Sequence, residues 1–307
     1  MAQRVSYPDH VRIREVGPRD GIQSEKARVP TADKIRFLDV LSSTGLRYIE
    51  AVSFVSPKAV PQMADAREVW EGMRRDPDVF YSALVPNARG AQTAADVGAD
   101  GMQVFISATD GYNRRNVGKS VEDSFADVAD VVEISSKADI PLEGTISCAF
   151  GDPYEGDVEP ERVADVAARM AGMGVSAISL GDTTGMGTPR GMEEVVTAVR
   201  RRLPDLDINL HLHDTRGTGL ANVLKGLELG VDYFDSSVGG MGGSPYATGA
   251  SGNIVTEDLV HMLADMGIET GIDLGKLLEA SRLAQGFIEG ELPSRLLKAG
   301  PRWRVPS

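Results

Sequence analysis

Short runs rich in β-branched and aromatic residues alternate along the chain with longer stretches whose apolar residues recur at helical spacing. The strand-like runs cover residues 11–16, 47–52, 79–84, 101–106, 141–150, 176–182, 208–214 and 231–237. The helix-like stretches include residues 31–43, 121–137, 161–173, 189–202 and 220–229, with further helix over residues 257–290. Thr31 is a candidate cap for the first helix, in which Ile35, Leu38 and Leu41 form an apolar stripe. The pattern therefore predicts eight strand–helix units in series.

Strand–helix alternation indicates right-handed crossovers and a parallel sheet. Eight units in about 250 residues match the size of a (β/α)8 barrel. We therefore predict an α/β fold, a (β/α)8 TIM barrel over about residues 11–255, with additional C-terminal helices over about residues 256–307. A doubly wound open sheet is the main alternative, but no G-x-G-x-x-G follows the first strand and polar clusters follow nearly every strand. Since no Pro- or Ser-rich linker interrupts the chain, we expect one domain over residues 1–307.

The composition, 42% hydrophobic and 25% charged over 307 residues, is typical of an ordinary globular protein. With 45 acidic and 32 basic residues the net charge is −13, which argues against an extended nucleic-acid surface. No apolar run approaches the roughly 20 residues that span a bilayer, and the first ten residues lack the apolar segment of a signal peptide. The single cysteine, Cys148, fits a reducing compartment. We therefore expect a cytoplasmic enzyme or binding protein without membrane or nucleic-acid partners.

Catalytic groups of TIM barrels lie at the C-terminal ends of the strands and in the loops that follow them. The polar residues at the predicted strand ends include Arg19, Asp20, Glu50, Asp182, His211 and His213, and a Gly-rich loop after the last strand ends at Asn253. These residues are the candidates for the chemistry of the protein.

The two histidines are the most informative of these candidates, because they use half of the four histidines in the chain. Residues i and i+2 of a strand point to the same face, so the His211 and His213 imidazoles should converge. With the Asp20 carboxylate and the Asn253 amide oxygen they make a mixed N/O set, which suits Mg²⁺ or Mn²⁺ better than structural zinc. The alternatives are two hydrogen-bonded histidines at a strand end, and an Asp20 that caps a helix while paired with Arg19. Ligands offered by three strand ends favour the metal site.

Taken in order, these segments resemble the 3-hydroxy-3-methylglutaryl-CoA (HMG-CoA) lyase family of metal-dependent TIM-barrel lyases. The matching segments are EVGPRDGIQSE (15–25), IEAVSFVSPKAVPQM (49–63), SCAFGDPYEGDV (147–158), SLGDTTGMGTP (179–189), HLHDTRGTGLAN (211–222) and GGSPYATGASGN (242–253). The resemblance extends over roughly residues 11–285, which is nearly the whole chain.

The resemblance implies a lyase that cleaves an HMG-CoA-like acyl-CoA to acetyl-CoA and acetoacetate. It implies that the metal ligands, for Mg²⁺ or Mn²⁺, are Asp20, His211, His213 and Asn253. It also implies that Arg19 stabilises the enolate while Glu50 orients the Arg19–Asp20 pair. The chemistry agrees, because a metal lowers the pKa of the substrate hydroxyl, a carboxylate or metal-bound water takes its proton, and a fixed guanidinium stabilises the thioester enolate.

Several positions depart from the family pattern. The family carries a loop cysteine that protonates the enolate, where this chain has Ser244, and a hydroxyl is a far weaker acid than a thiol with a pKa of about 8.5. We take Ser244 as a catalytic candidate, although a serine without a role in a Gly-rich turn is the alternative. Thr145 stands where tyrosine is usual, Arg216 replaces a tyrosine of the animal enzymes, and Asp152 replaces a frequent cysteine. These departures make a related tertiary 3-hydroxyacyl-CoA such as citramalyl-CoA, which would yield pyruvate, the nearest alternative substrate.

The residues predicted to contact the substrate acyl group are Arg19, Thr145, Asp182 and Arg216. The CoA phosphates require cations, and the predicted contacts are Arg114, Arg115 and Lys119, with Lys58 and Lys26 as weaker candidates.

A Claisen-condensing synthase is a less favoured function, because such chains carry a long C-terminal regulatory region and this one stops at Ser307. A non-catalytic homologue is disfavoured by the intact set of ligands. Since barrels of this kind often pair, we expect a homodimer or a higher homo-oligomer.

Overall fold

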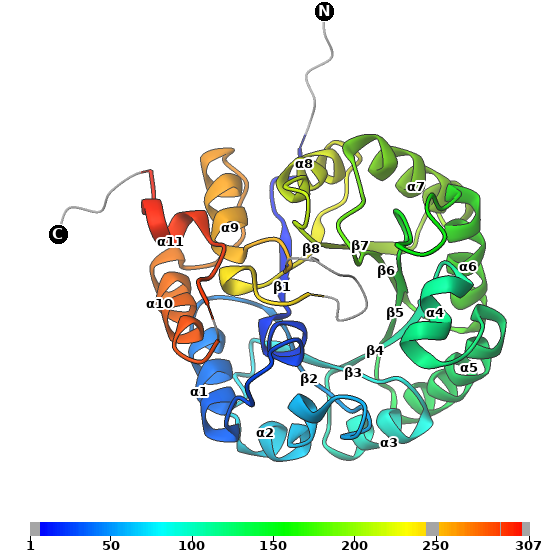
Figure 1. The fold of residues 1–307 in the computed structure, drawn as a ribbon, viewed down its shortest axis with the longest axis horizontal. Coiled ribbons are helices and arrows are strands. Elements are labelled where there is room, and N and C mark those ends of the chain that lie inside the picture. Colours follow the sequence, from blue (N-terminus) through cyan, green and yellow to red (C-terminus); the bar gives the residue numbers. More distant parts are fainter. Residues whose placement is uncertain (1–6, 244–251, 289, 303–307) are drawn as a thin grey trace, which may run out of the picture.

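Eight parallel strands form a closed barrel in sequence order within the residues that the computed structural model describes, 7–243, 252–288 and 290–302 (Figure 1). The strands are β1 (Arg12–Glu15), β2 (Tyr48–Ser53), β3 (Phe80–Leu84), β4 (Gly101–Ser107), β5 (Leu142–Ser147), β6 (Ala177–Asp182), β7 (Asp207–Leu212) and β8 (Tyr233–Ser236). The register Arg12↔Tyr233 to Glu15↔Ser236 between β1 and β8 closes the barrel. The predicted TIM barrel is therefore confirmed.

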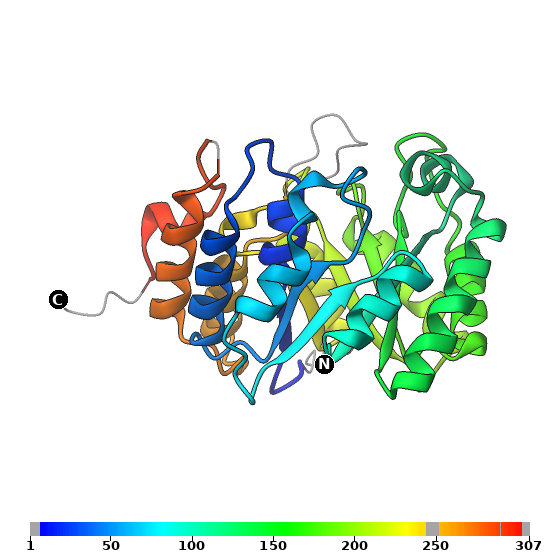
Figure 2. The same ribbon diagram turned by 90° about the horizontal axis from the view of Figure 1, so that it is seen from below.

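The helices lie around the outside of the barrel, as Figures 1 and 2 show. They are α1 (Thr31–Ser42), α2 (Ala66–Gly72), α3 (Ala88–Asp96), α4 (Asp110–Val117), α5 (Val121–Ala138), α6 (Pro160–Met173), α7 (Pro189–Arg202) and α8 (Gly219–Glu228). Each long helix buries an apolar stripe, as α7 does with Met192, Val195, Val196 and Val199. None of the helices in the described part of the chain is long and apolar enough to cross a membrane.

Three short helical turns follow strands or interrupt loops: η1 (Gly17–Gly21), η2 (Pro61–Met63) and η3 (Val238–Gly240). The C-terminal region forms α9 (Thr256–Asp265), α10 (Leu274–Gln285) and α11 (Arg295–Ala299), on the flank of the barrel beside α1 (Figure 1). The additional C-terminal helices are thus confirmed.

The structure corrects three local predictions. The further helix predicted over residues 257–290 is divided in two, because the chain turns at Gly267 and Gly271, whose φ angles are 76° and 73°. Strand β5 ends at Ser147 because Cys148 has a φ of 55°, which a strand cannot accommodate. Thr31 is the first residue of α1 and not its cap; the cap position is Pro30.

The alternation of side chains along the strands separates the packed core from the barrel interior. On β5, Leu142 and Ile146 are buried under the outer helices, whereas Thr145 is half-buried and faces the interior. Toward the C-terminal ends of the strands the interior opens into a cavity of about 770 Å³. This cavity is where the candidate site residues meet.

Candidate active site

The turn η1 brings two of the predicted catalytic residues into the cavity. It is a single π-helical turn directly after β1, in which the amides of Asp20 and Gly21 donate to the carbonyl of Val16. Its side chains Arg19 and Asp20 both line the cavity. Such turns are often found at functional sites, because they aim side chains that a regular helix would space differently.

Arg19 lies between two carboxylates. Its Nε and Nη2 are 2.7 and 2.6 Å from Oε2 of Glu50, and its Nη1 donates to Oδ1 of Asp20 at 2.6 Å. Burial opposes ionisation of Asp20, but Arg19 and the two histidines outweigh it and hold the pKa of Asp20 below its ordinary value. The guanidinium is therefore fixed in one plane, with an ionised carboxylate beside it.

Asp20, His211 and His213 form a cluster whose ligand atoms all lie within 4.8 Å of one another. The two Nε2 atoms are 3.1 Å apart, and His213 Nε2 is 3.9 Å from Oδ2 of Asp20. Two nitrogens bound to one ion at about 2.1 Å and at right angles would lie about 3 Å apart. The predicted convergence of the histidines is confirmed, and the spacing fits a single divalent ion.

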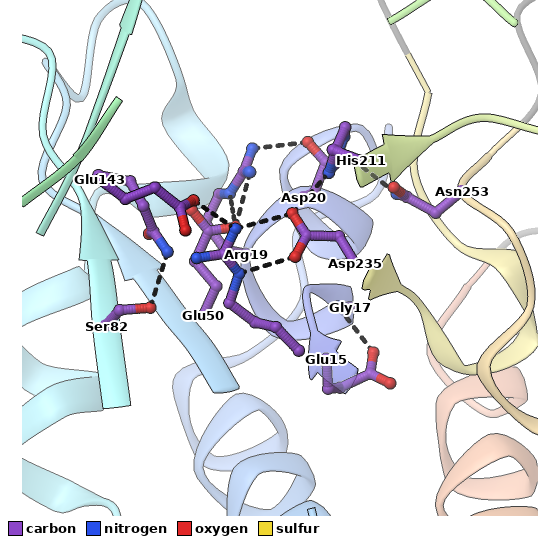
Figure 3. A network of polar contacts seen from close by, with 12 residues as sticks. Glu15, Gly17, Arg19, Asp20, Glu50, Ser82, Glu143, His211, Asp235 and Asn253 are labelled. Atoms are coloured by element: carbon purple, nitrogen blue, oxygen red, sulfur yellow. Dashed lines mark hydrogen bonds and ion pairs between the residues drawn. The ribbon is translucent and has the colours of Figure 1, made fainter. Parts of the chain in front are cut away.

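Asn253 completes this set from the segment after β8 (Figure 3). Its Nδ2 donates to Oδ2 of Asp20 at 2.7 Å, while its buried Oδ1 has no hydrogen-bond partner among the described residues. A Cβ on Gly242 would come within 2.5 Å of that Nδ2 and 3.0 Å of Asp20 Oδ2, so only glycine leaves this space open. A buried amide oxygen without a partner beside a carboxylate and two imidazoles fits a site for Mg²⁺ or Mn²⁺.

His211 is oriented from behind by Asp235 of β8. The His211 Nδ1 lies 3.0 Å from Oδ2 of Asp235. Burial alone would raise the pKa of Asp235, but Arg14 and His211 outweigh it and hold this pKa well below its usual range. Because the ionised carboxylate only accepts hydrogen bonds, a neutral His211 ring would carry its proton on Nδ1 and present the Nε2 lone pair to a metal.

Two of the predicted substrate contacts face away from the cavity. Asp182 accepts hydrogen bonds from the amides of Met186 and Gly187 at 2.8 and 3.0 Å, and Arg216 donates to the carbonyl of Thr184 at 2.8 Å. Neither Asp182 nor Arg216 is among the described residues that line the cavity. In the structure, both hold the loop between β6 and α7.

Thr145, by contrast, lines the cavity. Asp152 is buried and accepts hydrogen bonds from the amides of Tyr112, Tyr154 and Glu155, so it shapes the loop after β5. Ser244, the predicted replacement for the family cysteine, lies outside the described residues.

The cations proposed for CoA divide into two groups. Lys119 lines the cavity, as do Lys26 and Arg28, and Arg28 was not among the cations predicted from the sequence. Arg114 pairs with Asp110 at 3.1 Å and Arg115 stacks at 3.8 Å from the ring centroid of Tyr154, and these two arginines lie outside the described cavity lining.

The fold and the site together define a TIM-barrel protein with a candidate divalent-metal centre at the C-terminal ends of β1 and β7. A profile of the family described as HMGL-like matches residues 10–284. The chain belongs to this family.

The sequence is 50% identical over 294 residues to the mitochondrial hydroxymethylglutaryl-CoA lyase of Mus musculus, covering 96% of this chain and 90% of that relative. It is 47% identical over 298 residues to the cytoplasmic 3-hydroxy-3-methylglutaryl-CoA lyase of Mus musculus, covering 97% and 87%. The structure matches an HMG-CoA lyase from Acinetobacter baumannii, in complex with coenzyme A and 3-methylmalate, with a TM-score of 0.93, 39% identity and coverage of 100% and 99%.

Proposed function

We propose that this chain is a divalent-metal-dependent lyase that cleaves HMG-CoA to acetyl-CoA and acetoacetate. The observation that carries this proposal is one cavity in which a fixed guanidinium, Arg19, adjoins the Asp20, His211, His213 and Asn253 set. Full-length identity of about half to lyases of this name supports the same reaction.

A divalent ion held by Asp20, His211, His213 and Asn253 would supply a Lewis acid that lowers the pKa of the substrate hydroxyl. Cleavage removes the hydroxyl proton, breaks the C2–C3 bond and leaves its electron pair on the thioester enolate. Asp20 is ionised and lies beside Arg19, so it is placed to take that proton. Arg19 donates to the enolate oxygen as the negative charge develops there. Protonation of the enolate at C2 then gives acetyl-CoA.

Thr145 supports a second candidate substrate. Its half-buried side chain lines the cavity, where a tyrosine would fill more space. A differently shaped acyl group, such as that of citramalyl-CoA, would use this room and undergo the same bond cleavage to acetyl-CoA and pyruvate.

The acyl-CoA extends toward the cations that line the cavity, so we place the CoA phosphates near Lys26, Arg28 and Lys119. Arg114 and Arg115 lie outside the cavity lining, where they contact Asp110 and Tyr154, and they remain the less favoured candidates. We further propose a single domain over residues 1–307 and a cytoplasmic location; the relatives include both a mitochondrial and a cytoplasmic lyase. We also propose a homodimer or higher homo-oligomer, which light scattering of the purified chain tests.

The decisive experiment is an assay of the purified protein with Mn²⁺ against a panel of 3-hydroxyacyl-CoAs. Acetyl-CoA and acetoacetate should both form from HMG-CoA, in equal amounts. If the enzyme forms pyruvate from citramalyl-CoA and no product from HMG-CoA, the second candidate is the substrate. If no member of the panel is cleaved, the protein is not a lyase of this kind.

A further inference from the structure

Arg14 places a buried, hydrogen-bonded guanidinium in the barrel interior that takes no part in the proposed chemistry. It lies on β1, is 4% exposed and lines the cavity. Its Nε and Nη2 donate to Oδ1 and Oδ2 of Asp235 at 2.8 and 2.9 Å, and its Nη2 also reaches Glu143 at 2.6 Å. Such a two-point fork fixes the plane of the carboxylate as well as its position.

The first chain of hydrogen bonds from Arg14, which we call the first arm, runs through Asp235 to the metal ligand His211. Asp235 accepts hydrogen bonds from Arg14 on both oxygens, from Asn209 on Oδ1 at 2.7 Å and from His211 on Oδ2 at 3.0 Å. The carboxylate that sets the tautomer and ring orientation of His211 is therefore itself held in place by Arg14. Figure 3 shows the Asp235 carboxylate close to His211.

The second arm runs from Arg14 through Gln103 and Glu50 to Arg19, the residue proposed to stabilise the enolate. The Gln103 side chain lies between Arg14 and Glu50. With the amide turned so that its oxygen accepts from Nη1 of Arg14 and its nitrogen donates to Oε1 of Glu50 at 2.8 Å, both neighbours are satisfied. Glu50 in turn holds Arg19 through Oε2 at 2.7 Å. All three guanidinium nitrogens of Arg14 thus act on neighbours of the site.

We propose that Arg14 is a positioning residue for this site, holding His211 through Asp235 and Arg19 through Gln103 and Glu50. The inference rests on the proposed function, because it assigns a role toward the same metal and the same enolate. Since Arg14 touches neither, its effect is geometric. A lysine would keep the charge, but its single nitrogen cannot hold both oxygens of Asp235 while contacting Gln103.

The test is Mn²⁺ affinity, measured by titration calorimetry without substrate, together with kcat and KM. Arg14→Lys should raise the Kd for Mn²⁺ about 10–100-fold, which is the usual effect of removing a group that orients a metal ligand. It should also lower kcat more than it raises KM. Gln103→Met cuts only the second arm, so it should lower kcat and leave the Kd for Mn²⁺ within about threefold of wild type.

Arg12→Lys is the matched control. Arg12 lies two residues earlier on β1 and outside the cavity lining. Its Nη1 and Nη2 donate to the two carboxylate oxygens of Asp207 on β7, and Nη2 also donates to Asp232. This variant loses a fork from the same strand at a more exposed site, with side-chain exposures of 26% for Arg12 and 5% for Arg14, and it should leave Mn²⁺ affinity unchanged. Glu143→Gln tests charge separately, because it removes one negative charge and leaves the fork on Asp235.

Equal Mn²⁺ affinities of Arg14→Lys and wild type would overturn the proposal, as would an equal loss in Arg12→Lys or Glu143→Gln. If Arg14→Lys does not fold, a Gln103→Met enzyme with unchanged kcat would overturn the second arm. A wild-type protein that binds no Mn²⁺ would overturn the metal site as well. The predicted change in affinity without cleavage of HMG-CoA would retain the role of Arg14 and contradict the proposed function.

Discussion

Replacing Arg19 by lysine isolates the contribution of its planar fork from that of its charge. The guanidinium uses Nε and Nη2 on Glu50 and Nη1 on Asp20, and these contacts hold its plane fixed beside the cavity. A lysine ammonium can contact one of these carboxylates but cannot span both and still donate to the enolate. The substitution therefore removes one oriented donor from the transition state.

Loss of one such donor costs about 10²–10³-fold in kcat, or about 2.7–4 kcal/mol of transition-state stabilisation. We expect the Arg19→Lys enzyme to show this loss in kcat, with a smaller change in KM, in a steady-state assay of acetyl-CoA formation with saturating Mn²⁺. Arg190→Lys, on the exposed face of α7 where the side chain pairs with Glu194, is the control and should leave both constants unchanged.

A rise in KM without a fall in kcat would refute this reasoning, because it would mean that Arg19 binds the substrate equally in the ground state and the transition state. A normal kcat combined with weakened Mn²⁺ binding would show instead that Arg19 acts only on Asp20.

Chelation by EDTA should abolish activity and added Mn²⁺ should restore it, while Asn253→Ala should weaken Mn²⁺ binding by calorimetry, since its Oδ1 is left without a partner among the described residues. Burial raises the pKa of Glu15 from 4.5 to about 8, so the folded chain keeps a proton there that the unfolded chain releases near pH 4.5. Stability should therefore fall as pH rises from about 4.5 to 8, and Glu15→Gln should flatten this fall in Tm measured from pH 5 to 8. Ser244→Cys alone should not raise kcat for HMG-CoA if the acyl pocket differs, whereas adding Thr145→Tyr should; a single variant with the higher kcat would show that only the proton donor was missing.

The fold follows from patterns that need no knowledge of distant contacts. Alternating strand and helix periods identify the eight strands, and the parity of a strand predicts that His211 and His213 share a face. Boundaries shift where one backbone angle decides them, as at Cys148 and Gly267. Backbone angles of this kind cannot be predicted from the pattern of hydrophobic residues.

Strand parity also decides which polar residues at the strand ends face the cavity. Gly181 and Thr183 line the cavity, so Asp182 between them must face outward, toward the loop it holds. In the same way Arg14 faces inward and Glu15 outward, where Glu15 accepts hydrogen bonds from Gly17 and Val238. A polar residue at a strand end therefore belongs to the site only when its parity matches that of a ligand.

The pairing of Arg14 with Asp235 and Glu143 could not be predicted from the sequence, because it depends on which residues oppose one another across a closed and staggered barrel. The available signal was charged residues inside strands that are otherwise buried, as at Arg14 in VRIRE, Glu143 in PLEGTIS and Asp235 in VDYFDSS. Such a signal shows that partners exist without naming them.

The charges of this network give an independent reason for a divalent cation. Among the described residues it contains two guanidiniums and four carboxylates, 2 − 4 = −2, from Arg14, Arg19, Asp20, Glu50, Glu143 and Asp235. Burial raises the pKa of Glu50 and of Glu143 even though arginines lie against both, so loss of solvent makes each ionised carboxylate costly here. Buried charge is tolerated when it is paired or coordinates a metal. A divalent ion at Asp20, His211 and His213 would bring the sum to zero, so the side chains that hold the metal and those that orient them form one electrostatic unit.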